Sequence, residues 1–413
     1  MYEFISDTLS SSQYLWQRKE WPNWIYDFSQ LQEPLSKVEQ QQQVLFDRLA
    51  LIGMHQQDIL TLEAITNEVR QSSAIEGVNL DTDSVRSSVA RHLGVDIGGL
   101  ARSDRNVDGV VEMVLDATTH CDMPLTEDRL YGWHAALFPT GFSGILPVNV
   151  GQWRTGPMRV VSGAYGHNKV HYEAPPAAQL PHEMDCFLNW VNSQSTEHPI
   201  LRASIAHLWF VTIHPFEDGN GRIARAIGDM MLARADGQRQ RCYSFSAQVQ
   251  RDRMNYYKIL EKTQKGDMDV TAWMEWFVKS LGEAILHAQK KIEVTLQRAQ
   301  CWQNWERFSL NERQKKVLGR MLEDFRGYMR PQKWEKLTKC SSDQAIEDIA
   351  FLEKVGIFRV APNSGKKPGY EIVYPETLLN TTNDIYHRAD SEKAHDTDVQ
   401  NIERPRPSGP GGW

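Results

Sequence analysis

The segment from His214 to Arg225, which reads HPFEDGNGRIAR, constrains the fold of this chain more than any other. An apolar run with helical spacing, including Ile205 and Leu208, leads into the histidine. A second apolar run, which includes Ile223, begins directly after the glycines. The sequence therefore predicts two apolar helices joined by a tight loop, with a histidine where the first helix ends and glycines where the second begins.

The residue types in this loop suit a phosphate-bearing substrate. Glycines let backbone amides approach an anion closely, and the start of the following helix adds N–H donors with positive partial charge. Arg222 and Arg225, three residues apart, can bind phosphate oxygens. Asp218 supplies an oxygen ligand for Mg²⁺, and His214 can accept a proton near neutral pH. These are the groups that phosphoryl-type transfer requires.

The same residues resemble the Fic family motif, HPFx(D/E)GNGRxxR, at every specified position. The resemblance implies an enzyme, a protein adenylyltransferase that uses ATP with Mg²⁺ and moves AMP onto a Ser, Thr or Tyr hydroxyl. The acceptor would be a target protein, either another protein or the chain itself. The implied roles are general base for His214, Mg²⁺ ligand for Asp218, phosphate binding for Gly219, Asn220 and Gly221, pyrophosphate stabilisation for Arg222 and γ-phosphate binding for Arg225.

A second segment resembles the inhibitory pattern of Fic proteins, (S/T)xxxE(G/N). Residues 72–77 read SSAIEG, which matches it through Ser72, Glu76 and Gly77. The resemblance implies that Glu76 pairs with Arg225 and so excludes the productive pose of ATP. It also implies a second activity, the removal of AMP from a modified protein. A simpler interpretation, compatible with the first, is a helix C-terminus capped by Gly77.

A β-hairpin is predicted between Gly151 and Pro176, with its tip near Gly163–Asn168. The resemblance implies that this hairpin, which includes Val160 and Val161, is a flap that pairs with the target as an added strand. The alternative is an ordinary surface hairpin.

Two aromatic groups have more than one interpretation. Tyr256 and Tyr257 lie where a tyrosine pair of Fic proteins lines the adenine pocket, but aromatic core packing explains them equally. An N-terminal aromatic cluster is predicted to pack in the core, and a ligand-stacking surface is the alternative. The members of that cluster are Tyr14, Trp16, Trp21, Trp24, Tyr26 and Phe28.

The length of 413 residues predicts two or three domains, and the fold class is expected to be mainly α. A Fic helical core with a β-hairpin flap is expected, followed by a small winged-helix-like domain. The expected boundaries are 1–60 for an N-terminal helical region, 61–281 for the catalytic domain with its inhibitory helix near 61–77, 282–308 for a helical connector, 309–376 for the winged-helix-like domain and 377–413 for a disordered tail.

The predicted C-terminal domain contains helices over 311–324, 331–338 and 342–354, followed by two short strands. Residues 311–369 hold 13 Lys or Arg and 8 Asp or Glu, a net charge of +5. One hypothesis is a DNA-binding transcriptional regulator with a nucleotide-sensing Fic core, in which 342–354 is the recognition helix and Lys366 and Lys367 lie on the wing. Carboxylates on that helix oppose this, and a protein-interaction or dimerisation module is the alternative.

Composition limits the class of protein and the cellular compartment expected for this chain. Hydrophobic residues make up 41% and charged residues 24%, as in a soluble globular protein, and the net charge of −7 does not suit a chain that binds nucleic acid throughout its length. The five cysteines are scattered, so neither a disulfide framework nor structural zinc is expected. With neither a signal peptide nor a membrane span evident, a cytoplasmic protein is expected. Fic relatives suggest a homodimer.

Overall fold

The computed structural model describes residues 14–97, 99, 103–162, 169–237, 241–325, 327–362, 364 and 368–374. The predicted hairpin tip at Gly163–Asn168, the two wing lysines Lys366 and Lys367, and the tail 377–413 lie outside these residues. The fold is mainly helical, as predicted, with small antiparallel hairpins. The chain divides into two compact units, and the division falls between Lys290 and Lys291.

The first unit contains the Gly-rich motif and eleven described helices or parts of them. In chain order they are α1 (Phe28–Ala50), α2 (Met54–Ile75), α3 (Thr82–Leu93), α4 (Arg105–Thr119), α5 (Glu127–Leu137), α6 (Leu180–Asn192), α7 (Pro199–Ile213), α8 (Asn220–Asp236), α9 (Phe245–Arg251), α10 (Arg253–Gln264) and the first part of α11 (Thr271–Trp305). Single 3₁₀ turns, η1 (Leu15–Gln17) and η2 (Ala177–Gln179), and two hairpins, β1–β2 (Phe142–Ser143 and Leu146–Pro147) and β3–β4 (Arg159–Ser162 and Lys169–Glu173), complete the unit.

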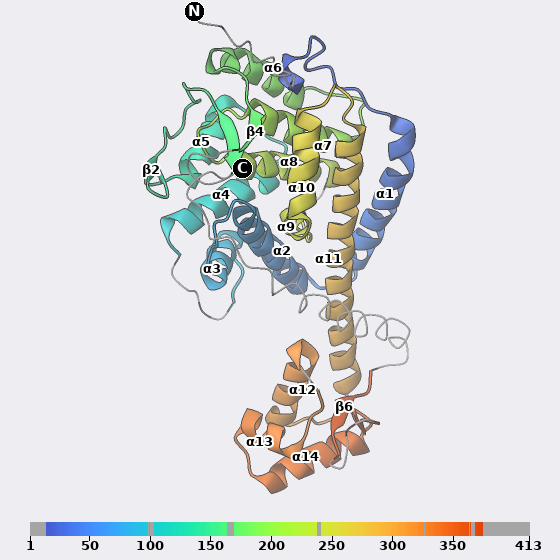
Figure 1. The fold of residues 1–413 in the computed structure, drawn as a ribbon. Coiled ribbons are helices and arrows are strands. Elements are labelled where there is room, and N and C mark those ends of the chain that lie inside the picture. Colours follow the sequence, from blue (N-terminus) through green and yellow to red (C-terminus); the bar gives the residue numbers. More distant parts are fainter. Residues whose placement is uncertain are drawn as a thin grey trace, which may run out of the picture. The chain divides into compact units, whose positions relative to one another are not determined.

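The helix pair α7–α8 forms the centre of this unit. Every residue of α7 from Ile200 to Ile213 is buried, and so is every residue of α8 from Asn220 to Ala233. Helix α7 is mostly apolar on all sides, as suits an interior helix, whereas α8 also buries charged side chains, among them Arg222, Arg225 and Asp229. Figure 1 shows α10 beside this pair, and α1 running alongside the first part of α11, where the Gln289 amide donates to the Gln41 carbonyl at 2.6 Å.

The N-terminal aromatic cluster packs inward only in part: Tyr14, Trp16, Trp21, Trp24 and Tyr26 are half-buried, whereas Phe28 is 49% exposed, contrary to the prediction. The rings of Trp21 and Trp24 lie edge-on to Trp209 of α7, with ring centroids 6.0 and 5.7 Å away. The boundary expected at residue 60 falls inside α2, a single helix that extends from Met54 to Ile75. The N-terminal region and the catalytic core therefore share one helix.

The second unit contains α12 (Glu312–Asp324), α13 (Pro331–Thr338), α14 (Ser342–Lys354), β5 (Phe358–Val360) and β6 (Tyr370–Ile372). The three helices and the strand pair match the order predicted from the sequence. Ser341 caps α14 by accepting from the Gln344 amide, and Gly356, at φ 76°, ends the helix. The side chains of Trp334, Ile349 and Phe358 pack in its core. The predicted domain boundaries stay predictions.

Candidate active site

The loop between α7 and α8 is held by its own residues. Gly219, at φ 83°, is the N-cap of α8, and a Cβ atom there would lie 3.0 Å from the Phe138 ring, so both backbone and space require glycine. The Asn220 side chain accepts from the Phe216 amide at 2.9 Å and donates to the Phe216 carbonyl at 2.8 Å. Asn220, for which the family resemblance implies phosphate binding, therefore uses its side chain to shape the loop.

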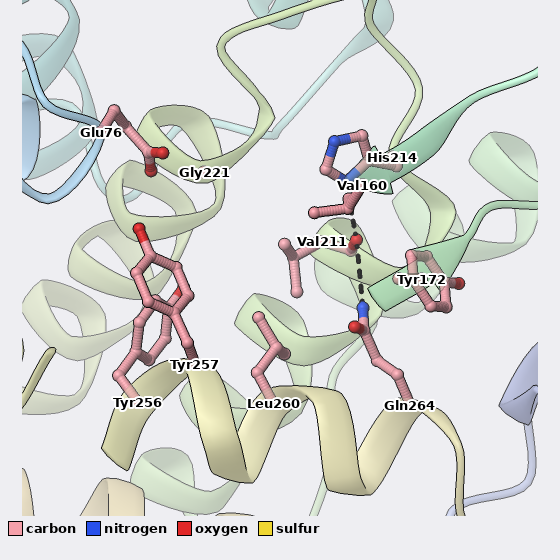
Figure 2. Close-up of a pocket in the computed structure, with 10 residues that line it drawn as sticks. All are labelled: Glu76, Val160, Tyr172, Val211, His214, Gly221, Tyr256, Tyr257, Leu260 and Gln264. Carbon is pink, nitrogen blue, oxygen red and sulfur yellow. Dashed lines mark hydrogen bonds between the residues drawn. The ribbon is translucent and has the colours of Figure 1, made fainter. Parts of the chain in front are cut away.

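His214 is fixed as a neutral ring with one defined acceptor. Its Nδ1 lies 3.0 Å from the Val211 carbonyl, and because a carbonyl only accepts, Nδ1 carries the proton and Nε2 the lone pair. Burial lowers the pKa of His214 to about 4, so the ring is neutral at pH 7. Figure 2 shows the ring next to Val160, across the pocket from Glu76. The site therefore has a proton acceptor in place.

Side chains from elsewhere satisfy the carbonyl groups that end α7. The Tyr172 hydroxyl donates to the Thr212 carbonyl at 2.6 Å, and Arg154 Nε donates to the His214 carbonyl at 2.8 Å. Such carbonyls have no partner within a helix and need one when buried. The positioning role of Tyr172 and Arg154 cannot be predicted from the sequence, because their partners are 40 and 60 residues away and leave no local pattern.

Arg222 and Asp218 lie together at the start of α8. Arg222 Nη2 is 3.8 Å from Asp218 Oδ1, and the guanidinium carbon is 5.1 Å from the centre of the Phe138 ring. Burial lowers the pKa of Arg222, and its Nε has no hydrogen-bond partner among the described residues. A buried donor of this kind is ready to receive an anion.

Asp218 fits a magnesium site that is shared with phosphates. Its carboxylate is about one-third exposed, and one oxygen accepts from the Ser143 hydroxyl. Mg²⁺ in nucleotide sites commonly takes one or two carboxylates, several waters and phosphate oxygens. A single partly exposed carboxylate beside a donor-rich helix start matches this mode. Ser143, which holds Asp218, was not found from the sequence.

Arg225 is joined to the segment with the predicted inhibitory pattern by three hydrogen bonds. Its Nε donates to the Ser72 hydroxyl at 3.0 Å, and its Nη2 donates to the Ser72 carbonyl at 2.8 Å and to Glu76 Oε1 at 2.7 Å. The side chains of Arg225 and Glu76 are 1% and 7% exposed. Burial raises the pKa of Glu76 and outweighs the attraction of Arg225, which lowers it. The structure thus brings Arg225 to two neighbouring residues, Ser72 and Glu76, that are about 150 positions away from it in the sequence.

The end of α2 has the geometry of a Schellman cap. The Gly77 amide donates to the Ala74 carbonyl and the Val78 amide to the Ser73 carbonyl, both at 3.0 Å, with Gly77 at φ 82°. The simpler interpretation of Gly77 is therefore confirmed. Since Glu76 is the residue between the helix and this glycine, the cap fixes where its side chain begins.

The tyrosine pair of α10 has two different partners. The Tyr257 hydroxyl donates to the Ile75 carbonyl at 2.9 Å, where Arg253 Nε donates as well, also at 2.9 Å. The Tyr256 hydroxyl lies 3.0 Å from His207 Nε2 in the core. Tyr257 therefore contacts the C-terminal end of α2, which the sequence did not indicate.

These elements line one pocket that is partly open to solvent. Figure 2 shows Glu76, Tyr256 and Tyr257 at one end and His214, Val160 and Tyr172 at the other. Gly221, Val211, Leu260 and Gln264 complete the lining. The pocket thus places both predicted tyrosines and the flap residue Val160 beside the motif.

The predicted hairpin is present as β3–β4. Val160 pairs with Tyr172 and Val161 with Val170, and the register shifts between Val160 and Val161. Val160 is buried, whereas Val161 is half-buried. Pairing of this hairpin with a target segment stays a prediction.

Two family models match the chain. Residues 124–232 match the Fic/DOC family, and residues 14–95 match a domain of unknown function, DUF4172. A protein named protein adenylyltransferase Fic from the sea anemone Nematostella vectensis is 28% identical over 57% of this chain and 52% of its own length. The protein of the same name from Drosophila melanogaster is 33% identical over 26% of this chain and 22% of its own.

The chain spans about half or less of the length of these relatives. Among solved structures, a Fic family protein from Desulfovibrio desulfuricans is similar over 82% of this chain and 96% of its own, at 17% identity and a TM-score of 0.48. Among the described residues of our chain, no helix combines the length and apolarity that crossing a membrane demands.

Proposed function

The chain contains a Fic domain, and from this premise we propose that it is a protein adenylyltransferase, which transfers AMP from ATP to a Ser, Thr or Tyr hydroxyl of a protein. One observation supports this above the others. A neutral, buried histidine with its lone pair on Nε2 lines the same pocket as the start of a helix that carries two buried guanidiniums. A proton acceptor beside an anion site is the arrangement that nucleotidyl transfer needs.

In the proposed reaction His214 Nε2 takes the proton of the acceptor hydroxyl. The hydroxyl oxygen then attacks the α-phosphorus. The bond between this phosphorus and the oxygen that bridges to the β-phosphate breaks, and pyrophosphate leaves with both electrons of that bond. Arg222 and Arg225 stabilise the charge that collects on the leaving group. Bound Mg²⁺, held by Asp218 and phosphate oxygens, would neutralise charge on the α- and β-phosphates. The negative charge of bound ATP also raises the pKa of the ring, which makes His214 a better base than in the free protein.

We further propose that Glu76 inhibits this reaction. Arg225 is engaged by the carboxylate and by Ser72, so a γ-phosphate finds the guanidinium already paired. The second carboxylate oxygen, Oε2, is buried and has no hydrogen-bond partner among the described residues. An oxygen of this kind suits the positioning of a water molecule, which supports the second predicted activity, removal of AMP.

A role of the second unit in binding DNA has less support. The exposed face of α14 carries Asp343, Glu347 and Glu353, and these carboxylates would repel phosphates. Asp348 points inward, where it accepts from Arg313 and Asn311. A protein-interaction or dimerisation role remains the better hypothesis for this unit, and a homodimeric, cytoplasmic protein stays a prediction.

Mass spectrometry of the Glu76→Gly protein with ATP and Mg²⁺ tests the proposal. We expect a mass increase of one AMP on the chain itself or on proteins of a cell extract. The rate should be tenfold or more above wild type, because the variant lacks the carboxylate that pairs with Arg225. A tenfold change in rate corresponds to about 1.4 kcal/mol. His214→Ala in the same background serves as the control and should transfer nothing. Absence of transfer by Glu76→Gly, with ATP bound, would overturn the proposed activity.

A further inference from the structure

The segment Tyr14–Asp27, here called the strap, touches the flap at its base. Trp16 Nε1 donates to the carbonyl of Glu173, the last residue of β4, at 2.8 Å. The ring of Tyr14 lies edge-on to Tyr172, with centroids 5.2 Å apart and planes at 81°. Both strap residues also pack against a small buried cluster formed by Val160, Tyr172 and Ala174.

The residue that the strap contacts is itself tied to the catalytic helix. Tyr172 is 1% exposed, and its hydroxyl donates to the carbonyl of Thr212, two residues before His214. Its cross-strand partner is Val160, which lines the pocket next to the histidine (Figure 2). A chain of direct contacts therefore leads from the strap through Tyr172 to both the flap and the end of α7.

The strap is anchored firmly enough to act as a support. Arg18 Nη2 donates to the Gly266 carbonyl and Trp21 Nε1 to Glu183, each at 2.9 Å. Ile25 forms a short parallel bridge with Asp269, in which its amide donates to the Met268 carbonyl at 2.9 Å. These anchors lie on α6 and on the turn between α10 and α11, so the strap is fixed independently of the flap.

From these contacts we infer that Trp16 and Tyr14 are positioning residues for AMP transfer, and that the strap sets where the β3–β4 hairpin presents an acceptor hydroxyl to His214 Nε2. The inference rests on the proposed function and gives a role to part of the region matched as a domain of unknown function. Neither residue lines the pocket beside His214. Their effect is exerted through Glu173 and Tyr172, and small displacements of reacting groups have large effects on rate.

The test compares two variants of the full-length chain with their parent in the Glu76→Gly background, where the proposed inhibition does not intervene. Trp16→Phe removes the indole N–H that donates to the Glu173 carbonyl of β4, and it keeps an aromatic ring. Trp24→Phe is the matched control, because Trp24 lies on the same strap, packs on Trp209, and its N–H has no hydrogen-bond partner among the described residues. We measure kcat for AMP transfer, the KM for ATP, and hydrogen exchange of the β3–β4 amides.

For Trp16→Phe we expect kcat to fall about tenfold, as loss of roughly 1.4 kcal/mol of positioning would produce, with the KM for ATP unchanged. Its flap amides should exchange faster than those of the parent. Trp24→Phe should change neither kcat nor flap exchange beyond about twofold, even where it lowers the melting temperature equally. A kcat of Trp16→Phe equal to that of Trp24→Phe would refute the positioning role.

A second pair of variants decides the matter if Trp16→Phe fails to fold. Tyr14→Phe keeps the ring that packs on Tyr172 and should retain parent kcat, whereas Tyr14→Ala should lose about as much as Trp16→Phe. Equal activity of these two variants counts against the inference. Failure of the proposed function is distinguishable, because then the Glu76→Gly parent itself transfers no AMP.

Discussion

At the residue scale, the pair of Glu76 and Arg225 should make the proposed inhibition depend on pH. Burial raises the pKa of Glu76, so this carboxyl takes up a proton at a higher pH than an ordinary glutamate does. A protonated carboxyl has no charge with which to hold Arg225. We therefore expect the activity ratio of Glu76→Gly to wild type to shrink as the pH falls from about 8 to about 5, measured by incorporation of labelled AMP. A constant ratio would contradict this role of the carboxylate charge.

His214, the proposed general base, should remain unprotonated in mildly acidic solution. The pKa of His214 is lowered to about 4 by burial, so Nε2 keeps its lone pair well below the pH at which an ordinary histidine becomes protonated, near 6.5. For Glu76→Gly, kcat/KM for ATP should stay level from pH 8 to about 5.5 and decline only below that, because this ratio reports ionisations of the free enzyme. An acid limb centred near pH 6.5 would show that the ring is hydrated rather than buried.

The sequence predicted which residues meet at the site far better than it predicted what holds them. His214, Asp218 and the two arginines of α8 follow from one continuous motif, since their spacing in the chain fixes their spacing in space. Arg154 and Tyr172 act on the same loop from distant segments, and nothing in their local sequence shows it. Asn220 was predicted as a phosphate ligand, yet its side chain bonds the Phe216 backbone, a contact that depends on the folded loop.

At the element scale, the C-terminus of α2 is where inhibition can be adjusted without touching the carboxylate. The Ile75 carbonyl receives two donors from α10, Tyr257 and Arg253. Tyr257→Phe removes one of them, worth about 1 kcal/mol, and should raise wild-type activity roughly threefold to fivefold. The same change in the Glu76→Gly background should give no increase, which separates release of Glu76 from a direct effect on ATP. An equal increase in both backgrounds would contradict the proposed link.

The C-terminal cap of α2, which Gly77 forms, should also contribute to the free energy of unfolding. Gly77 has φ 82° with open space around its α-carbon, so Gly77→Ala introduces backbone strain without a clash. We expect a loss of about 1–2 kcal/mol in the free energy of unfolding by urea, together with partial relief of inhibition. Gly132→Ala is the control, since that glycine lies within α5 with similar open space and no positive φ. Alanine there should be neutral or stabilising.

Helix boundaries show why some elements were predictable. The second unit follows its local signals closely, because Ser341 and Gly356 mark both ends of α14 in the sequence itself. In the first unit, α2 runs through the expected boundary at residue 60. A domain boundary depends on which contacts form around a helix, and the apolar spacing within that helix carries no such information.

At the scale of the whole molecule, every residue proposed for the reaction, its positioning and its inhibition lies between Tyr14 and Gln264, within the first compact unit. We therefore expect a chain ending at Lys290 in the Glu76→Gly background to transfer AMP to its own residues within about twofold of the full-length rate, a difference worth about 0.4 kcal/mol. Cutting there keeps Ile285 and Ala288, the last buried residues of α11 before the division.

The comparison of the shortened and full-length chains must distinguish misfolding of the first unit from loss of a contribution that the second unit makes to AMP transfer. Thermal unfolding of the shortened chain, and its affinity for ATP, establish that the first unit is intact. If both match the full-length protein while transfer falls more than tenfold, the second unit takes part in the reaction. If transfer to itself is kept and transfer to proteins of a cell extract is lost, the second unit selects the target, which is the result expected of a protein-interaction module. Retention of both would leave α12–α14 without a part in catalysis or in target choice.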